Sequence, residues 1–233
     1  IMHFGQKNQK EQYSMANQKL ETSEKQRDLG ITISENCLPG TQCALAAKKA
    51  NSVLGQINRS FTCYTKDVML QIFKVFVRPH LEHAVTAWSP WHKKDIEVLE
   101  KIQHRATRRM SDVRGSYPER LQQLNLTTLE ERRRRGDAIE VFKCVRGYWG
   151  IDREPLFHVK EPTNPKTRHQ RSFMPLCMPH SKLDLRENFF TVRGAKLWND
   201  LPSNVRDSSS INIFKNAYDN YVTNLQKSGG GED

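Results

Sequence analysis

Two stripes of side chains run along residues 93–110 and constrain the fold more than any other feature of the chain. Apolar residues recur there at intervals of three and four, the spacing of one helical face; they are Ile96, Leu99, Ile102, Ala106 and Met110. A second stripe at similar spacing is basic and consists of Lys94, Lys101, Arg105 and Arg108. The first stripe predicts burial against other elements, and the second predicts an exposed face.

The positive charge of the chain is concentrated around this helix. The net charge is +11, and residues 44–114 carry thirteen basic and six acidic residues, whereas residues 1–43 carry five of each. Glu97 lies one turn before Lys101, a favourable order for pairing, but it balances only part of the stripe. An excess confined to one third of the chain indicates a surface facing an anionic partner, of which nucleic-acid phosphate is the commonest. A solvated basic face without a partner is the alternative.

Short strands are expected before residue 37. Apolar residues occur at residues 1–4, and side chains alternate around Ala16 and Asn17, which can form a tight turn. A further half-buried strand is predicted by the alternation of Leu29, Ile31 and Ile33. Since three short strands make a poor independent sheet, they are interpreted as the edge of a sheet that lies upstream of the first residue.

Two helices are expected between these strands and residues 93–110. The first is capped by Thr41, and its predicted buried face consists of Ala46, Ala50, Val53, Ile57 and Phe61. The second is capped by Thr65, and its predicted buried face consists of Met69, Ile72, Phe73 and Phe76. Pro79 lacks a backbone donor and must kink or restart the second helix.

Residues 77–91 contain two of the four tryptophans and lead into the basic helix. Leu81, Val85 and Trp88 continue the apolar face, so Trp88 is predicted to lie in the core. Trp91 suits either a core position or stacking on a nucleic-acid base. We interpret the segment mainly as a hinge and core clamp that positions the basic stripe.

Two capping boxes predict the next helices. One runs from Ser116 to Glu119, and the other from Thr127 to Glu130 opens a helix reaching about residue 145. This longer helix contains four consecutive arginines, residues 132–135, which must point around most of its circumference. At least one is expected near the apolar side, and pairing with acidic residues is favoured over phosphate contact. The candidate partners are Glu130, Glu131, Asp137 and Glu140.

The remainder of the chain is predicted to be a linker, a helical extension and a tail. Residues 151–182 contain five prolines and suggest a linker or extended loop. Residues 183–226 return to helical spacing, with Ser209 or Ser210 capping the last helix, and residues 227–233 are expected to be disordered. The predicted fold class is mainly α: short N-terminal antiparallel strands, then a helical bundle and a partly irregular C-terminal extension. No apolar run approaches the roughly 18 residues needed to cross a membrane, so no membrane partner is expected.

Catalytic and metal-binding patterns are weak. The chain has no Asp-Asp pair or Gly-rich phosphate loop, and no Ser or Cys stands in a nucleophile motif. A zinc site using Cys177, His180, His169 and Cys144 is a minor alternative, and His80 with His83 is interpreted as a packed pair rather than a ligand pair. Five scattered cysteines suit a reducing compartment, which predicts an intracellular protein, cytoplasmic and/or nuclear.

Several blocks, in order along the chain, carry a family resemblance. They are residues 2–5 (MHFG), 27–31 (RDLGI), 46–55 (AAKKANSVLG), 77–82 (VRPHLE), 87–90 (AWSP), 98–106 (VLEKIQHRA), 117–121 (YPERL), 129–134 (LEERRR), 188–190 (NFF), 198–202 (WNDLP) and 214–215 (FK). Their order and spacing resemble the region downstream of the polymerase active site in non-LTR (LINE-type, jockey-like) retrotransposon reverse transcriptases.

The resemblance implies a domain organisation and a function. Residues 1–36 would be the last palm strands, residues 37–150 the helical thumb that grips the template–primer duplex, and the remainder a C-terminal extension. The catalytic aspartates and their Mg²⁺ would lie in a palm upstream of this chain, so no cofactor and no polymerase activity are expected of the chain itself. The expected partners are RNA, an RNA–DNA duplex and the palm of the same polyprotein. The expected phosphate contacts are Lys48, Lys49, Lys94, Lys101, Arg105, Arg108 and Arg109.

Two other functions are compatible with the sequence. The chain could be an inactive remnant of such an element, which the upstream reading frame would reveal. It could also be a protein-interaction module in which Phe189, Phe190 and Trp198 form a docking surface. Mutating these aromatic residues, rather than the basic stripe, would then abolish binding.

Overall fold

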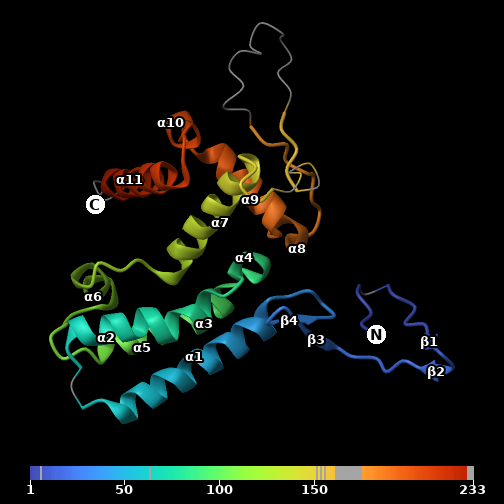
Figure 1. The fold of residues 1–233 in the computed structure, drawn as a ribbon, viewed down its shortest axis with the longest axis horizontal. Helices are drawn as coiled ribbons and strands as arrows, with labels where there is room; N and C mark the ends of the chain where they lie inside the picture. Colours follow the sequence, from blue (N-terminus) through green and yellow to red (C-terminus); the bar gives the residue numbers. More distant parts are fainter. Residues whose placement is uncertain are drawn as a thin grey trace, which may run out of the picture. The chain divides into compact units, whose positions relative to one another are not determined.

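The computed structural model describes residues 1–5, 7–62, 64–150, 152, 154, 156–160 and 175–229. It is mainly helical with two short antiparallel strand pairs near the N-terminus, so the predicted fold class is confirmed (Figure 1). The chain forms two compact units, Ile1–Arg133 and Arg134–Asp233. None of the described helices has the length and apolar character needed to cross a membrane.

Two hairpins make up the strand region. β1 (Ser14–Met15) pairs with β2 (Gln18–Lys19) across Ala16 and Asn17, whose φ angles of 49° and 63° are those of the tight turn expected there. β3 (Lys25–Asp28) pairs with β4 (Ile31–Ser34) across a second turn at Leu29 and Gly30.

The second hairpin corrects the prediction that Leu29 begins a half-buried strand. Leu29 and Gly30 have φ angles of 45° and 87°, and Leu29 is 87% exposed. Glycine adopts positive φ without strain, so the chain reverses there and β3, which the apolar pattern did not predict, pairs with β4. Residues 1–4 were expected to be a strand but are irregular.

α1 (Gly40–Ser60) buries a face of mostly small residues. Ala46, Ala50 and Ile57 lie on it as predicted, and Leu54 takes the place expected for Val53. Phe61 falls beyond the helix and is 42% exposed, so its predicted burial was wrong. The helix begins after Pro39 rather than with a cap from Thr41.

The next helix is interrupted before Pro79, as predicted, but the interruption changes which residues are buried. α2 (Lys66–Ile72) continues through a π-helical turn, η1 (Phe73–Val77), into α3 (Arg78–Glu82), and the Arg78 N–H donates to the Phe73 carbonyl. The wider turn rotates the face, so Val77 is buried while Phe76, predicted to face inward, is 58% exposed. Pro79 then lies in the first turn of α3, where its missing N–H costs little.

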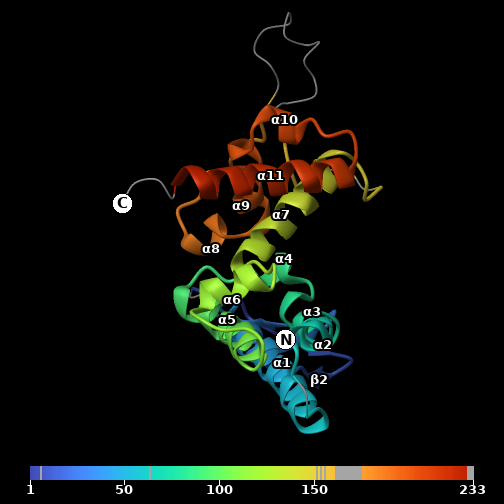
Figure 2. The same cartoon turned by 90° about the vertical axis from the view of Figure 1, so that its left-hand side faces the viewer.

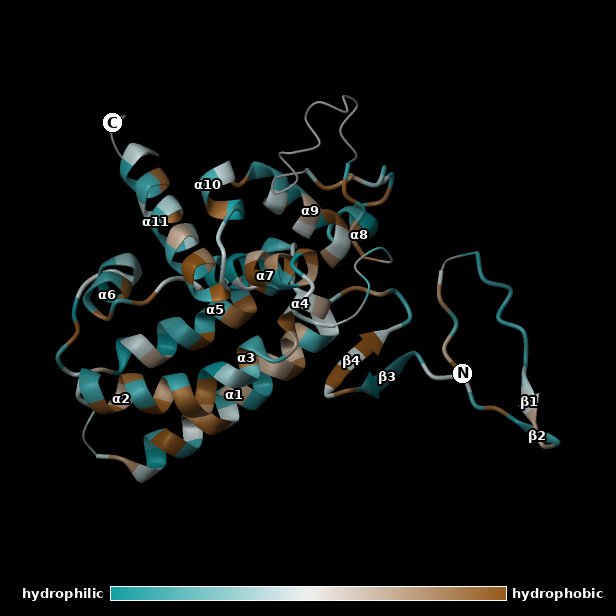
Figure 3. Ribbon diagram, turned by 45° about the horizontal axis from the view of Figure 1, so that its top comes forward, coloured by the Kyte–Doolittle hydropathy of each residue, from teal (hydrophilic) through white to brown (hydrophobic). Residues whose placement is uncertain are grey.

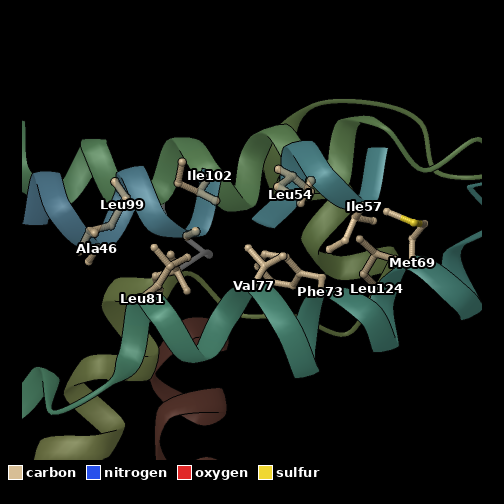
Figure 4. Close-up of a cluster of buried hydrophobic side chains, with 14 of the residues drawn as sticks. Ala46, Leu54, Ile57, Met69, Phe73, Val77, Leu81, Leu99, Ile102 and Leu124 are labelled. Atoms are coloured by element: carbon tan, nitrogen blue, oxygen red, sulfur yellow. The ribbon is translucent and has the colours of Figure 1, made fainter. Parts of the chain in front are cut away.

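The core of the first unit is formed where α1, the α2–η1–α3 segment and α5 (Lys93–Arg108) pack together. In Figure 4, Ala46, Leu54 and Ile57 of α1 lie opposite Leu81, Val77, Phe73 and Met69, with Leu99 and Ile102 of α5 beside them. Figure 3 shows α1 and α2 alternating between hydrophilic and hydrophobic colours, as expected of helices with one buried face.

Residues 77–91 contribute several side chains to the core of the first unit. Val77, Leu81 and Trp88 are buried, and α4 (Val85–Trp88) follows a break at Ala84, where φ is 49°. The Trp88 indole N–H donates to the His83 carbonyl at 2.9 Å, so the predicted core role of Trp88 is confirmed.

Capping boxes open the next two helices. Ser116 and Glu119 cap α6 (Tyr117–Gln123) as predicted. α7 (Leu129–Val145) begins one residue later than expected, because the box is formed by Thr128 and Glu131 rather than by Thr127 and Glu130.

The second unit has an aromatic core where α7, α9 (Phe190–Asp200) and α11 (Ile211–Gly229) meet (Figure 2). Phe142 stacks on Phe214 at 4.4 Å between ring centroids, and Trp198 lies 6.3 Å from Phe214. α8 (Asp184–Glu187) and α10 (Ser203–Arg206) are short connecting helices. Ser210 caps α11 by accepting from the Ile213 N–H at 3.3 Å.

The two compact units divide inside α7, between Arg133 and Arg134. The start of α7 belongs to the first core through Leu129, whereas Val141 and Phe142 belong to the second. In the predicted linker, Val159 and Leu176 form an isolated antiparallel bridge, and residues 161–174 lie outside the described residues. α11 includes residues 227–229 of the predicted disordered tail, so that part of the prediction was wrong, and residues 230–233 are not described.

Candidate nucleic-acid interface

The predicted basic residues lie on α1 and α5, the two longest helices of the first unit apart from α7. All seven are exposed: Lys48 and Lys49 on α1, Lys94, Lys101, Arg105 and Arg108 on α5, and Arg109 at the end of α5. Their side chains are therefore accessible to a ligand.

The α5 residues share one face because of their spacing. At about 100° per residue, Lys94, Lys101 and Arg108 project within about 60° of Arg105. Leu99, Ile102 and Ala106 are buried and project about 60–120° around the helix from Arg105, so the predicted amphipathic helix is present. We call the exposed face formed by Lys94, Lys101, Arg105, Arg108 and Arg109 the α5 stripe.

α1 lies alongside α5 and runs in the same direction. At their beginnings, a methyl group placed on Gly40 would lie 3.3 Å from Asp95 Oδ1. Farther along, the Arg105 guanidinium donates through Nη1 to Asn51 Oδ1. From the first contact to the second, α1 advances by eleven residues and α5 by ten. The two helices therefore run in the same direction.

The structure separates the two lysines of α1. Lys48 lies one turn before Asn51 and therefore on the side of α1 that meets the α5 stripe. Lys49 projects about 100° away, toward α3, where the pKa of His80 is lowered by burial and then by Lys49. Lys48 therefore extends the α5 stripe, and Lys49 does not.

Few carboxylates oppose this charge. α1 contains no acidic residue, and over the described part of the chain none of the seven basic residues forms an ion pair. On α5, Asp95 is buried, and only Glu97 is an exposed acid.

The excess of positive charge also acts on His104 of α5. Its pKa is lowered by burial and by the positive charges of Arg120 and Arg108.

The third acid of α5, Glu100, is directed away from the stripe. Its carboxylate accepts hydrogen bonds from the Tyr117 hydroxyl and, at 3.0 Å, from the Leu129 N–H. Burial raises the pKa of Glu100, although these two hydrogen bonds oppose the shift. Gln103 strengthens the same junction by donating to the Thr127 carbonyl at 2.9 Å. The network fixes α5 against α6 and the start of α7.

Sequence reasoning missed the residues that hold this surface in place. Asn51, Glu100 and Gln103 are polar residues whose partners come from other elements, so no spacing along their own helices identifies them. The only signal was that Gln103 interrupts an otherwise apolar region of α5.

The arginines of α7 have a different environment. Arg133 is buried, as expected for one of the four. Arg132 forms a two-point ion pair with Glu82, and Arg135 forms one with Asp219 at 2.6 and 2.8 Å. Structural pairing was predicted, but these acids are distant in sequence and were not among the expected partners.

Three of the expected partners have other hydrogen bonds or ion pairs. Asp137 binds Arg193, Glu140 binds Lys143, and Glu131 closes the capping box.

The aromatic docking surface considered from the sequence is not formed. Trp198 and Phe190 are buried in the second core, and only Phe189 is exposed, with the Arg186 guanidinium over its ring. In the first unit, Trp91 is half-buried beside His92, at 5.3 Å between ring centroids.

The described residues contain no group of three or more His, Cys, Asp or Glu side chains that could hold a metal ion. Of the considered zinc ligands, Cys144 is buried in α7, His180 is exposed, and His169 lies outside the described residues. His83 is exposed and contacts the Leu29 carbonyl through Nε2 at 3.4 Å, and His80 is partly buried.

The fold and the surface thus define a class, a helical domain with an exposed and unneutralised basic face. Comparison with known protein families, curated proteins and solved structures gives no match to the chain.

Proposed function

We propose that the first unit binds the phosphate backbone of a nucleic-acid duplex through Lys48 and the α5 stripe. The observation that carries this proposal is that these basic side chains are exposed, share one side of two parallel helices and have no carboxylate partner among the described residues. Lys49 belongs to the predicted set but contributes from a neighbouring face.

Backbone recognition suits such a surface. Lysine and arginine contacts to phosphate fix a protein on a duplex without reading sequence, and they make binding strongly dependent on salt. RNA–DNA hybrids and RNA duplexes are recognised largely through shape and backbone. α5 is anchored by its buried face and by the Glu100 junction, so the stripe would present its charges from a fixed support.

The resemblance to non-LTR reverse transcriptases extends the proposal to a role. The unit would act as the thumb that holds template and primer, and a palm in the same polyprotein would supply the catalytic aspartates and Mg²⁺. The chain alone would bind duplex without polymerising. The hairpin β3–β4, whose strand β3 is exposed along its length, would lie on the palm side.

Charge reversal of the stripe tests the proposal. The variant Lys101→Glu, Arg105→Glu, Arg108→Glu should bind an RNA–DNA hybrid of about 20 base pairs at least about a hundredfold more weakly in about 0.1 M salt, because three phosphate contacts are replaced by repulsion. Fluorescence anisotropy measures the affinity, and repetition at several salt concentrations gives the number of contacts.

A matched control separates this surface from net charge. Lys19→Glu, Lys25→Glu, Arg27→Glu makes the same charge change at exposed positions of the hairpins and should retain most of the affinity. Equal losses in both variants would mean that overall charge, not the stripe, governs binding. Unchanged affinity of the stripe variant would overturn the proposal.

A further inference from the structure

Asn51 and Arg105 meet where α1 and α5 lie side by side, and both side chains are exposed. Arg105 donates through Nη1 to Asn51 Oδ1, so the side-chain acceptor of this pair is occupied. The remaining groups are mostly donors, since the asparagine amide offers two N–H groups and the guanidinium four more, against one further lone pair on the amide oxygen. A ligand that supplies acceptors therefore suits both side chains together.

The surrounding charges favour an anionic acceptor. Lys48 lies one turn before Asn51, while Lys101 and Arg108 lie one turn to either side of Arg105, and neighbours at these spacings have Cβ atoms about 5–6 Å apart. α1 has no acidic residue, and Glu100 is engaged with Tyr117 and Leu129, so the exposed acid of α5 is Glu97, two turns before Arg105. A tetrahedral oxyanion with two unshared oxygens can accept from the amide and the guanidinium together.

Asn51 also restricts Arg105. An exposed arginine normally loses rotamer freedom when it binds, and this loss opposes affinity. Because Asn51 already holds the guanidinium beside α1, part of this ordering is complete before a ligand arrives.

We propose that Asn51 and Arg105 form a discrete phosphate-binding site between α1 and α5, with Lys48 and Lys101 at its rim. This inference rests on the proposed function, because the ligand is a phosphodiester group of the duplex backbone. It assigns Asn51 two roles: its oxygen positions Arg105, and its amide N–H groups bind the phosphate. The site fixes one backbone position against the α1–α5 pair, while the other cations of the stripe contribute less directional attraction.

Asn51→Asp is the decisive variant, because its carboxylate can pair with Arg105 and preserve the link between the helices. It removes the amide donors and neutralises the guanidinium. We expect about tenfold weaker binding of the RNA–DNA hybrid. The slope of log affinity against log salt concentration should fall by the equivalent of about one phosphate contact. The unfolding temperature should be no lower than that of the unmodified chain. If Asn51 only joined the two helices, this variant would lose no more affinity than Ser52→Asp, which adds the same charge to α1.

Ser52→Asp is the matched control, since it adds the same charge at the next exposed position, about 100° around α1. Because Ser52 lies one turn after Lys48 and away from Arg105, this variant should weaken binding by no more than about threefold, clearly less than Asn51→Asp. Equal losses for Asn51→Asp and Ser52→Asp would show a diffuse effect of charge and overturn the inference.

Asn51→Ala removes both functions of the amide without adding charge. An affinity at least about threefold lower supports the site, and unchanged affinity overturns it, whatever the stability of the aspartate variant. If Lys101→Glu, Arg105→Glu, Arg108→Glu abolishes binding while both Asn51 variants bind normally, the discrete site fails but the proposed function stands. If the triple variant binds normally, the proposed function fails as well.

Discussion

α5 and α7 are both rich in arginine, yet their arginines have opposite environments. The α5 stripe is exposed and has no ion pair with any described carboxylate. On α7, Arg132 and Arg135 form two-point ion pairs with Glu82 and Asp219, and Arg133 is buried. The consecutive arginines of α7 therefore serve in structural contacts, whereas the spaced cations of α5 remain exposed.

The difference follows from spacing. Residues three or four apart stay on one side of a helix, so the α5 stripe can project to solvent while the opposite face packs. Four consecutive arginines turn about 100° at each step, so some must face neighbouring elements, where they require partners. A run of arginines is thus weaker evidence for a nucleic-acid surface than a periodic stripe of the same charge.

Replacing one arginine in each region by methionine should produce opposite results, and this pair gives the largest effects expected from comparing the two helices. Arg132→Met removes an ion pair between partly buried groups and should lower the free energy of unfolding by about 1–2 kcal/mol, because among the described residues Glu82 then keeps only Arg78, at 3.7 Å. Duplex binding should not change. Urea unfolding and anisotropy provide the two measurements.

Arg108→Met is the counterpart on α5. Stability should stay within about 0.5 kcal/mol of the original, since Arg108 is exposed and has no ion pair in the described structure. Affinity should fall several-fold, with the salt dependence reduced by about one contact. A loss of stability in Arg108→Met, or a loss of binding in Arg132→Met, would remove the distinction between the two helices.

The second ion pair of α7 should contribute less than the first. Arg135 and Asp219 have side-chain exposures of 34% and 49%, so solvent screens their attraction. Asp219→Asn should lower the free energy of unfolding by about 0.5 kcal/mol, and the loss should shrink in 1 M salt. Asp200→Asn, a change at another exposed aspartate of the second unit, is the control and should have no measurable effect.

The smallest expected effect concerns Glu100, the carboxylate that α5 keeps away from its stripe. Burial raises its pKa above the ordinary value of 4.5, so the folded state holds the proton more tightly than the unfolded state. This stabilising contribution is complete below pH 4.5 and is lost as pH rises through the folded pKa. The stability of the chain relative to its Glu100→Gln variant should therefore decrease from about pH 4 to pH 7, as measured by urea unfolding. A constant or increasing difference would mean that hydrogen bonds from Tyr117 and Leu129 outweigh burial.

The sequence predicted elements well where a local pattern alone decides them. The apolar spacing of α5, the turn at Ala16 and Asn17, the Ser116–Glu119 capping box and the interruption at Pro79 all depend on residues within one or two helical turns. It failed where a small local change shifts the register. The π-helical turn exposed Phe76, and Gly30 reversed a chain expected to continue as a strand.

The residues of the candidate site were likewise predicted only in part. Its cations were predicted, because charge and helical spacing are properties of the sequence. Asn51 was not, because its importance comes from Arg105, 54 residues later in the chain. Glu82 and Asp219 were missed as partners of α7 for the same reason.

By itself, then, the sequence determined a mainly helical chain, the two faces of α5 and the concentration of positive charge around it. Only the tertiary structure decided which of these charges are neutralised. Helical periodicity depends on near neighbours and can be read along the chain. Ion pairing depends on distances between elements, because an arginine is neutralised only where packing brings a carboxylate within reach. On α7 packing supplies those carboxylates, and on α5 it directs Glu100 away and leaves the stripe exposed.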